Sequence, residues 1–204
     1  LGELTGHDAE VIPNWVHGSL QAAVERLDVE GVKRQPCTLF YSGNLGVKQG
    51  LPDFLPLFLM HAEGWSLRVH GGGPEAESMR SAHEANPRFQ LRPLLDEPEY
   101  VRALRTAAVC LITQRSGSGQ SFLPSKLLPA LATGTPVLAV CDADSPLGRE
   151  VSANGFGVVV RPGDEAALGR VLRAWKDDPG ALDGFRARAA ERARAFSRDQ
   201  VLSR

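Results

Sequence analysis

Two lysines stand beside glycine-rich or serine-rich segments, a combination that can bind phosphate. Lys48 lies in residues 41–50, YSGNLGVKQG, where glycines allow the backbone to come close to a ligand. Lys126 ends residues 114–126, QRSGSGQSFLPSK, and is expected in the first turn of a helix. A cation is unfavourable there unless an anion lies beside it, and backbone N–H groups at such turns favour phosphate. The alternatives are a glycine-rich turn without a ligand, and a Lys126 side chain that extends into solvent or pairs with an acid.

Other chemically active residue types give weaker signals. Residues 71–76, GGGPEA, fit the dinucleotide fingerprint GxGxxG/A. They follow the second expected strand instead of the first, and glycine suits any tight turn. Glu150, in residues 145–150, either binds ligand hydroxyls or lies on the surface. The five histidines show neither HxxxH nor HExxH spacing, so no metal site is expected.

Composition excludes several classes of protein. The 204 residues carry 23 Lys and Arg against 24 Asp and Glu, so binding to nucleic acid through bulk charge is not expected. No apolar run approaches the ~20 residues that cross a bilayer, so we expect no transmembrane helix. Cys37, Cys110 and Cys141 form no CxxC pair, and we expect reduced thiols in a cytoplasmic protein.

Apolar runs that alternate with helical segments indicate the fold. Strands are expected at residues 37–42, 65–70, 89–91, 108–113, 136–140 and 157–160. Helices are expected at residues 51–62, 74–86, 97–106, 124–133, 145–153 and 164–176. Because single helices separate strands that are apolar on both faces, the pattern predicts an α/β fold with a Rossmann-like, parallel six-stranded sheet and helices on both faces. Ligands of such sheets bind at the carboxyl ends of the strands, where the glycines gather.

The motifs, in this order, resemble the C-terminal half of the retaining GT-B glycosyltransferases of family four. Among them, the capsule and colanic-acid exopolysaccharide enzymes are the most similar. The segments that carry the resemblance are VIPNWV at 11–16, YSGNLGVKQG at 41–50, VHGGGPE at 69–75, PLL at 93–95, LPSKL at 123–127, ATGTPV at 132–137 and GVVVRPGD at 157–164.

The resemblance implies one half of a two-domain GT-B enzyme. In that family an N-terminal domain binds the acceptor, and a C-terminal domain binds a sugar nucleotide. Residues 1–17 would be the remnant of the N-terminal domain and its crossover, and residues 18–36 a linker. Residues 37–178 would be the nucleotide-sugar-binding domain, and residues 179–204 a C-terminal amphipathic helix. The N-terminal domain, whose absence the start at Leu1 fits, would hold most catalytic groups.

Matched position by position, the resemblance places the donor against named residues. Gly43 and Asn44 match the Gly-Arg turn of the family, with Asn in place of Arg. Lys48 or Gln49 matches its phosphate-binding lysine, and Leu94 with Leu95 borders the nucleotide base. The expected donor and phosphate site consists of Gly43, Asn44, Lys48, Gly71, Gly73, Gln114, Ser118, Ser125 and Lys126.

The sequence departs from the family where the sugar and the ribose are held. The family has two glutamates eight residues apart, and these positions are Ser121 and Pro129 here. Ser121 and Glu150 are the candidates for the ribose or sugar contact, and Lys126, Gln114 and Ser118 are further substitutes. Pro129 lies inside the expected helix 124–133 and is expected to bend it.

We therefore expect the donor-binding domain of a glycosyltransferase. The whole enzyme would transfer a sugar from a UDP- or GDP-sugar to a saccharide or lipid-linked acceptor in polysaccharide biosynthesis, and this domain alone would be inactive. We expect no cofactor and no metal. The expected partners are a nucleotide-sugar and the N-terminal domain, not nucleic acid, with peripheral association at the inner face of the membrane. The alternatives are half of a sugar-nucleotide epimerase or phosphorylase, and a non-catalytic nucleotide-binding module.

Overall fold

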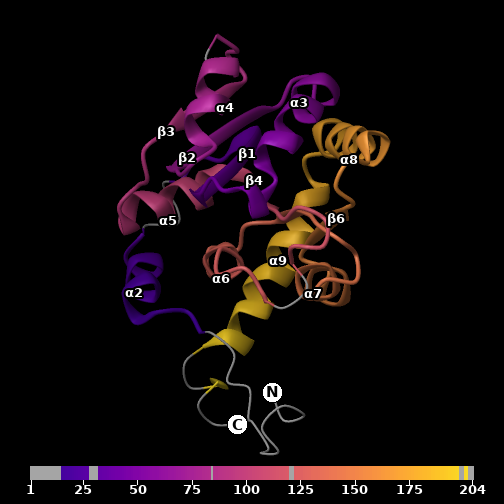
Figure 1. Ribbon diagram of the computed structural model, residues 1–204. Coiled ribbons are helices and arrows are strands. Elements are labelled where there is room, and N and C mark those ends of the chain that lie inside the picture. Colours follow the sequence, from indigo (N-terminus) through magenta and orange to yellow (C-terminus); the bar gives the residue numbers. More distant parts are fainter. Residues whose placement is uncertain (1–14, 28–31, 84, 120–121, 198–199, 202–204) are drawn as a thin grey trace, which may run out of the picture.

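The computed structural model describes residues 15–27, 32–83, 85–119, 122–197 and 200–201. These residues form one six-stranded sheet of parallel strands in the order β3-β2-β1-β4-β5-β6 (Figure 1). The strands are β1 (Gln35–Asn44), β2 (Ser66–Gly72), β3 (Phe89–Arg92), β4 (Ala107–Thr113), β5 (Val137–Val140) and β6 (Gly157–Val160). The predicted α/β fold with a parallel six-stranded sheet is confirmed.

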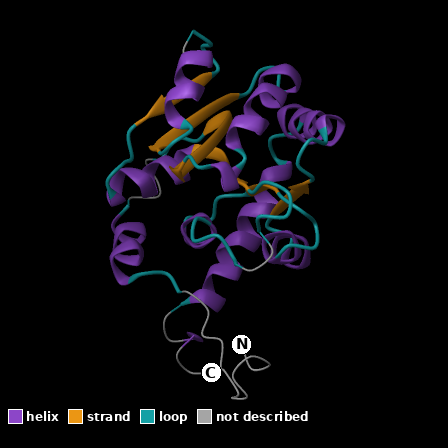
Figure 2. Ribbon diagram, viewed as in Figure 1, coloured by secondary structure: helices purple, strands orange, loops and turns teal. Residues whose placement is uncertain are grey.

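Helices cover both faces of the sheet (Figure 2). One face packs against α3 (Leu51–His61), α4 (Ala76–His83) and α8 (Glu165–Asp177). The other face packs against α2 (Gly18–Arg26), α5 (Glu97–Thr106), α6 (Leu127–Ala132), α7 (Pro146–Asn154) and α9 (Ala181–Ala193). Two short 3-10 turns, η1 (Val47–Gln49) and η2 (Arg194–Phe196), complete the described elements. All seven residues of β4 are buried, because helices cover this central strand on both sides.

Side-chain caps explain where several helices begin. Asp96 accepts a hydrogen bond from the Glu99 amide at 2.9 Å before α5. Ser145 caps α7 and Asp164 caps α8 in the same way. Each cap satisfies an N–H group that lacks a partner within the helix. These signals are local in the sequence, which is why the starts of these three helices were predicted within one residue.

The departure from the expected elements that matters most for the glycine- and serine-rich segments is the start of α6. This helix begins at Leu127 instead of residue 124, so Ser125 and Lys126 precede it. Pro129 is therefore its third residue, where the helix requires no N–H donor. The prediction that Pro129 lies in the helix interior is wrong for this reason. In addition, β1 runs to Asn44, so Gly43 and Asn44 are the last residues of a strand.

The two ends of the described chain pack on the domain. α2 packs against α5, and the Val16 amide donates to the Phe196 carbonyl at 3.1 Å. The amphipathic helix expected over residues 179–204 is shorter in the structure, because α9 ends at Ala193 and Phe196 lies in η2; Leu182, Ala189 and Phe196 are buried. Of the residues 1–17 expected to form the domain remnant and its crossover, residues 1–14 lie outside the described residues.

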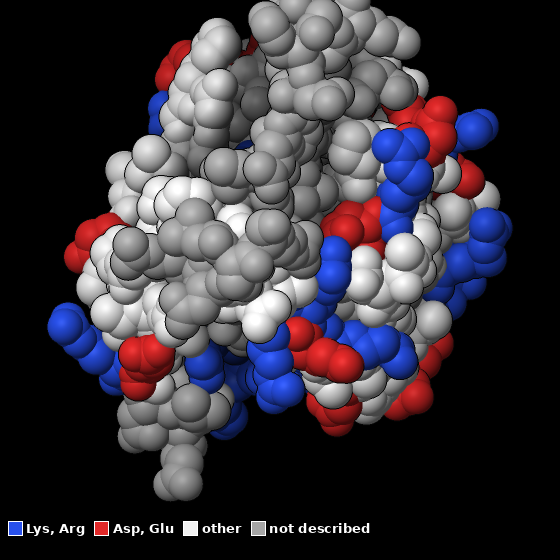
Figure 3. Space-filling view, turned by 90° about the horizontal axis from the view of Figure 1, so that it is seen from below, with Lys and Arg blue, Asp and Glu red and all other residues white. Residues whose placement is uncertain are grey.

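Both signs of charge lie on the surface. Figure 3 shows Lys and Arg side chains interspersed with Asp and Glu side chains on the face seen from below. This distribution fits the net charge of -1. None of the helices in the described part of the chain has the length and apolar character that a bilayer span requires.

Candidate functional site

A cleft of about 640 Å³ opens at the carboxyl end of β1, the edge where doubly wound sheets bind ligands. One part of its lining is polar and consists of Ser42, Gly43, Asn44, Gln49, Ser125 and Lys126. Another part is largely apolar and consists of Trp15, Val16, Leu20, Leu94, Leu95, Tyr100, Leu128 and Pro129. His17, Ser19 and Glu97 complete the lining. A mainly apolar cleft with a few polar groups suits an organic ligand with an anionic end.

Lys126 is the ammonium group in the polar part of the cleft. Its Nζ atom donates to the Tyr41 hydroxyl at 2.6 Å and lies 3.8 Å from the centre of the Tyr41 ring. The Tyr41 hydroxyl donates in turn to the Asn44 carbonyl at 2.7 Å. Burial lowers the pKa of Lys126 to about 8. The group is therefore mostly charged at pH 7, and two of its three N–H donors remain for an anion.

The charge of Lys126 is poorly compensated by its surroundings. Tyr41 is fully buried, and burial raises its pKa, so its hydroxyl stays neutral. Burial also raises the pKa of the nearby Cys110 thiol to about 12. No salt bridge within the described residues involves Lys126. A partly buried cation whose described contacts are neutral groups and an aromatic ring favours an anionic ligand.

Gly43 makes the position of Lys126 possible. A Cβ atom on Gly43 would lie 2.7 Å from the Lys126 Cε atom, which is too close for either side chain to stay in place. Its φ of 129° is also a backbone conformation that favours glycine. Gly43 and Lys126, which the sequence places in separate motifs, therefore form one unit.

Gly71 and Gly73 have a packing role. A Cβ atom on Gly71 would lie 2.1 Å from the Gly43 carbonyl oxygen, and one on Gly73 would lie 2.5 Å from the Asn44 Oδ1 atom. The loop after β2 is further tied to Leu45, whose amide donates to the Gly72 carbonyl at 2.9 Å. Gly71 and Gly73 thus allow the loop after β2 to pack closely against the end of β1, and neither lines the cleft.

The serine-rich loop after β4 holds the η1 turn. The Lys48 carbonyl accepts hydrogen bonds from the Arg115 amide and the Ser118 hydroxyl, both at 2.9 Å. Asp142 anchors the same loop by accepting from the Ser116 hydroxyl and the Gly117 amide, both at 2.7 Å, and these bonds lower the pKa of Asp142. The Lys48 side chain is exposed, and neither Lys48 nor Ser118 lines the cleft.

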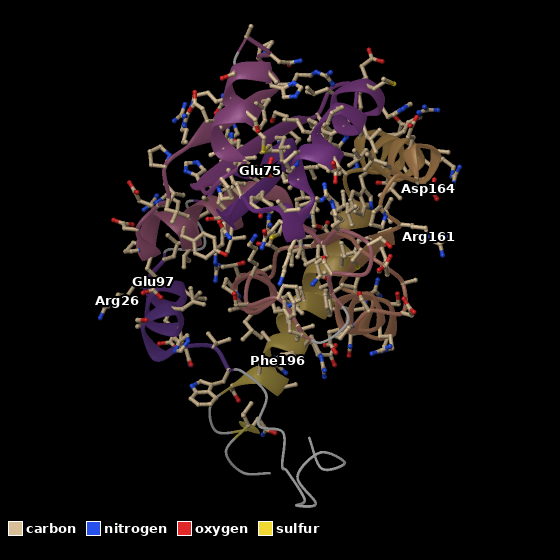
Figure 4. The ribbon with its side chains drawn as sticks, viewed as in Figure 1. Arg26, Glu75, Glu97, Arg161, Asp164 and Phe196 are labelled. Atoms are coloured by element: carbon tan, nitrogen blue, oxygen red, sulfur yellow. The ribbon has the colours of Figure 1, made fainter. Side chains whose placement is uncertain are left out.

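Gln114 points to a different place. It is 6% exposed and lines a separate cavity of about 90 Å³ between α3 and α8, together with Arg161 and Asp164, which Figure 4 labels. Its side-chain Nε2 and Oε1 atoms are buried and have no hydrogen-bond partner among the described residues. The structure therefore does not bring Gln114 to the cleft that holds Lys126.

The candidates for the ribose and sugar contacts are also dispersed. Glu150 forms a two-bonded ion pair with Arg192 of α9, with distances of 2.5 and 3.2 Å, and does not line the cleft. Ser121 lies outside the described residues. Pro129 does line the cleft, so an apolar ring occupies the position where the family pattern has a glutamate.

Three groups at the cleft were missed by the sequence analysis. Tyr41 lies within the expected buried strand 37–42, although its place before a glycine-rich turn could have indicated a role at the site. Ser19 donates to the Glu97 Oε1 atom at 3.1 Å, so α2 forms a wall of the cleft together with the start of α5. Residues 18–36 had been predicted to be a linker, and no local signal links Ser19 to Glu97.

A doubly wound parallel sheet in the order 3-2-1-4-5-6, with a cleft at the carboxyl end of its first strand, defines the class of Rossmann-like ligand-binding domains. The family model of the glycosyl transferases group 1 matches residues 36–178. The chain therefore belongs to this glycosyltransferase family.

Two relatives are known by name. The chain is 28% identical over 166 residues to a protein named as the colanic acid biosynthesis glycosyl transferase WcaI of Escherichia coli (strain K12), covering 76% of this chain and 41% of the relative. It is 26% identical over 140 residues to the exopolysaccharide phosphotransferase SCO2592 of Streptomyces coelicolor, covering 68% and 14%. The chain thus spans less than half of the length of either relative.

Solved structures share the fold. The sucrose-phosphate synthase of Thermosynechococcus elongatus superposes with a TM-score of 0.72 at 20% identity, over 94% of this chain and 49% of that chain. The S. aureus protein TarM, in a complex that includes UDP, superposes with a TM-score of 0.74 at 13% identity, over 98% and 40%. These similarities identify the fold as one Rossmann-like half of the GT-B architecture.

Proposed function

We propose that this chain is the donor-binding domain of a sugar-nucleotide glycosyltransferase of polysaccharide biosynthesis. The observation that carries the proposal is Lys126, a partly buried ammonium without a carboxylate partner among the described residues, which lines a cleft of nucleotide size. The diphosphate of a nucleotide-sugar would accept hydrogen bonds from Lys126 and lie against the bare backbone of Gly43. The nucleoside would lie along the apolar part of the cleft, beside Leu94 and Leu95.

In this arrangement Lys126 assists the reaction by holding the leaving group. When the bond between the sugar and the diphosphate breaks, negative charge grows on the diphosphate. A fixed cation in a partly buried site stabilises that charge more than water does. The charge comes from the protein, so the proposal requires no metal ion, and EDTA should leave nucleotide affinity unchanged.

The acceptor and the remaining catalytic groups are proposed to lie in an N-terminal domain of the same protein. Relatives of which this chain covers only 41% and 40% support this arrangement. The cytoplasm is the proposed location, because all three cysteines are free thiols and two of them are buried. Association with the inner face of the membrane would then serve a lipid-linked acceptor.

Calorimetric titration of the 204-residue chain with UDP, GDP and their sugars tests the proposal. Millimolar nucleotide should bind the wild type, and Lys126→Met should weaken binding by about 10- to 100-fold, the effect of losing a charged hydrogen bond. Lys48→Met is the matched control, because Lys48 is exposed outside the cleft, and should change affinity less than about twofold. If none of these nucleotides binds the wild-type chain, the proposal is contradicted.

One observation favours a second candidate, a non-catalytic nucleotide-binding module. Pro129 lines the cleft at the position where the family pattern has a glutamate, and its ring offers no carboxylate for ribose or sugar hydroxyls. Expression of the whole reading frame that contains this chain, followed by assay of sugar release from UDP- and GDP-sugars, distinguishes the two functions. Nucleotide binding without turnover would favour the non-catalytic module.

A further inference from the structure

The cleft carries opposite charges in two different parts of its lining. Lys126 lies where β1 ends and α6 begins, whereas Glu97 lies at the start of α5. Among the described residues that line the cleft, Glu97 is the only carboxylate. Figure 4 shows Glu97 where α5 meets α2. This charge pattern defines an orientation for any ligand with one anionic end.

Two observations place Glu97 away from the phosphate end. A carboxylate repels a diphosphate, so the two cannot share one part of the cleft. Lys126 precedes α6 and donates to Tyr41 of β1, whereas Glu97 begins α5 and accepts from Ser19 of α2, and no salt bridge of the described residues joins the two. A nucleoside diphosphate would therefore bind with its phosphates at Lys126 and its other end toward Glu97.

The carboxylate of Glu97 is held in place and keeps acceptor capacity. Its Oε1 atom accepts from the Ser19 hydroxyl at 3.1 Å, which links α5 to α2 across the cleft wall. An ionised carboxylate accepts about four hydrogen bonds and donates none. The neighbouring acids differ, because Asp96 caps the helix and Glu99 lies outside the cleft lining.

The bases differ in what they offer to such a group. Guanine presents two adjacent donors, N1–H and N2–H₂, which match the two oxygens of a carboxylate. Uracil presents one N–H between two carbonyl oxygens, and these oxygens repel a carboxylate. Adenine and cytosine present an amino group next to a ring acceptor. A site with a carboxylate at the base therefore rejects the bases that leave it unpaired or repelled.

The apolar surroundings favour a base over a sugar at this end. Leu95 lies two residues before Glu97 and Tyr100 three residues after it, and Leu20 lines the cleft from α2. These side chains can cover the faces of a planar ring while Glu97 reads its edge. We propose that Glu97 selects guanine, so that the donor of this domain is a GDP-sugar; this inference rests on the proposed donor-binding function.

Calorimetry with GDP and UDP tests the assignment at pH 7. The wild-type chain should bind GDP at least about tenfold more tightly than UDP. Glu97→Gln replaces one carboxylate oxygen by an NH₂ group. The glutamine side chain can then accept from the N–H of uracil and donate to one of its carbonyl oxygens. It should lower GDP affinity about tenfold and leave UDP affinity equal or higher. Glu99→Gln, with the same loss of charge in the same helical turn, should change both affinities less than about twofold.

A second variant keeps the test independent of α5. Ser19→Ala removes the hydroxyl that holds Glu97 and should weaken GDP binding without weakening UDP binding. UDP binding to the wild type as tightly as GDP overturns the assignment, and so does an equal loss of both nucleotides in Glu97→Gln, which would indicate a ribose contact. Failure of both nucleotides to bind the wild type contradicts the proposed function itself.

Discussion

Replacement of Lys126 by methionine should stabilise the folded chain. Burial lowers the pKa of this lysine from 10.5 to about 8, which corresponds to a cost of about 3 kcal/mol for keeping it charged at pH 7. Methionine keeps an unbranched chain of similar length and removes the charge. It also removes the hydrogen bond to Tyr41, worth about 1 kcal/mol. The net gain in the free energy of unfolding is therefore about 2 kcal/mol.

Urea unfolding of the ligand-free wild type and Lys126→Met at pH 7 measures this gain, with an unchanged m-value as the sign that both unfold alike. The midpoint of thermal unfolding should rise by about 4–8 °C. Lys126 loses its proton near pH 8 in the folded wild type and near pH 10.5 in the unfolded chain. The difference in the free energy of unfolding between the two proteins should therefore shrink as pH rises from 8 to 10.5. A destabilised variant, or a difference that does not change with pH, would show that the charge is already compensated in the fold.

Further predictions concern the cleft and its supports. GDP or UDP affinity of the wild type should fall by up to about tenfold per pH unit above pH 8, because free Lys126 loses its proton, and calorimetry of Lys126→Met should show no such decline. Gly43→Ala should weaken nucleotide binding, since its Cβ atom would lie 2.7 Å from the Lys126 Cε atom and force this flexible side chain to shift, whereas Gly117→Ala, also at a positive φ but with open space around it, should retain binding. Glu150→Gln should leave affinity within about twofold and lower stability by about 1 kcal/mol in urea unfolding, because it weakens only the ion pair with Arg192. Asp142→Asn should speed hydrogen exchange at the Gly117 amide, which the carboxylate now holds.

The sheet could be predicted because its determinants are local. Each strand is a short apolar run closed by glycine or a polar turn, and alternation with single helices dictates parallel pairing. The start of α6 could not be located in this way. Pro124 and Pro129 both fit a first helical turn, and in the structure residues 124–127 form a separate turn, in which the Leu127 amide donates to the Pro124 carbonyl at 3.0 Å, before α6 begins.

The site was predictable only in part, for a physical reason. Lys126 could be found because a cation near a helix start conflicts with the helix dipole. Gln114 and Ser118 are polar residues of a loop, and the sequence does not determine on which side of the sheet a loop side chain lies. The contact between Ser19 and Glu97 joins two helices far apart in the chain. Such contacts depend on the tertiary packing of α2, for which no local pattern exists.

The hydrogen bond from Val16 to Phe196 has a consequence for synthesis on the ribosome. Val16 lines the cleft, and its amide is held by a residue that is translated near the end of the described chain. At about 5–20 residues per second, the nascent chain exposes β1 and its glycine turn many seconds before Phe196 emerges. The hydrogen bond that ties Val16 to the domain can form only after Phe196 has left the exit tunnel. Attachment of this part of the cleft lining is therefore among the last steps in the folding of the described chain.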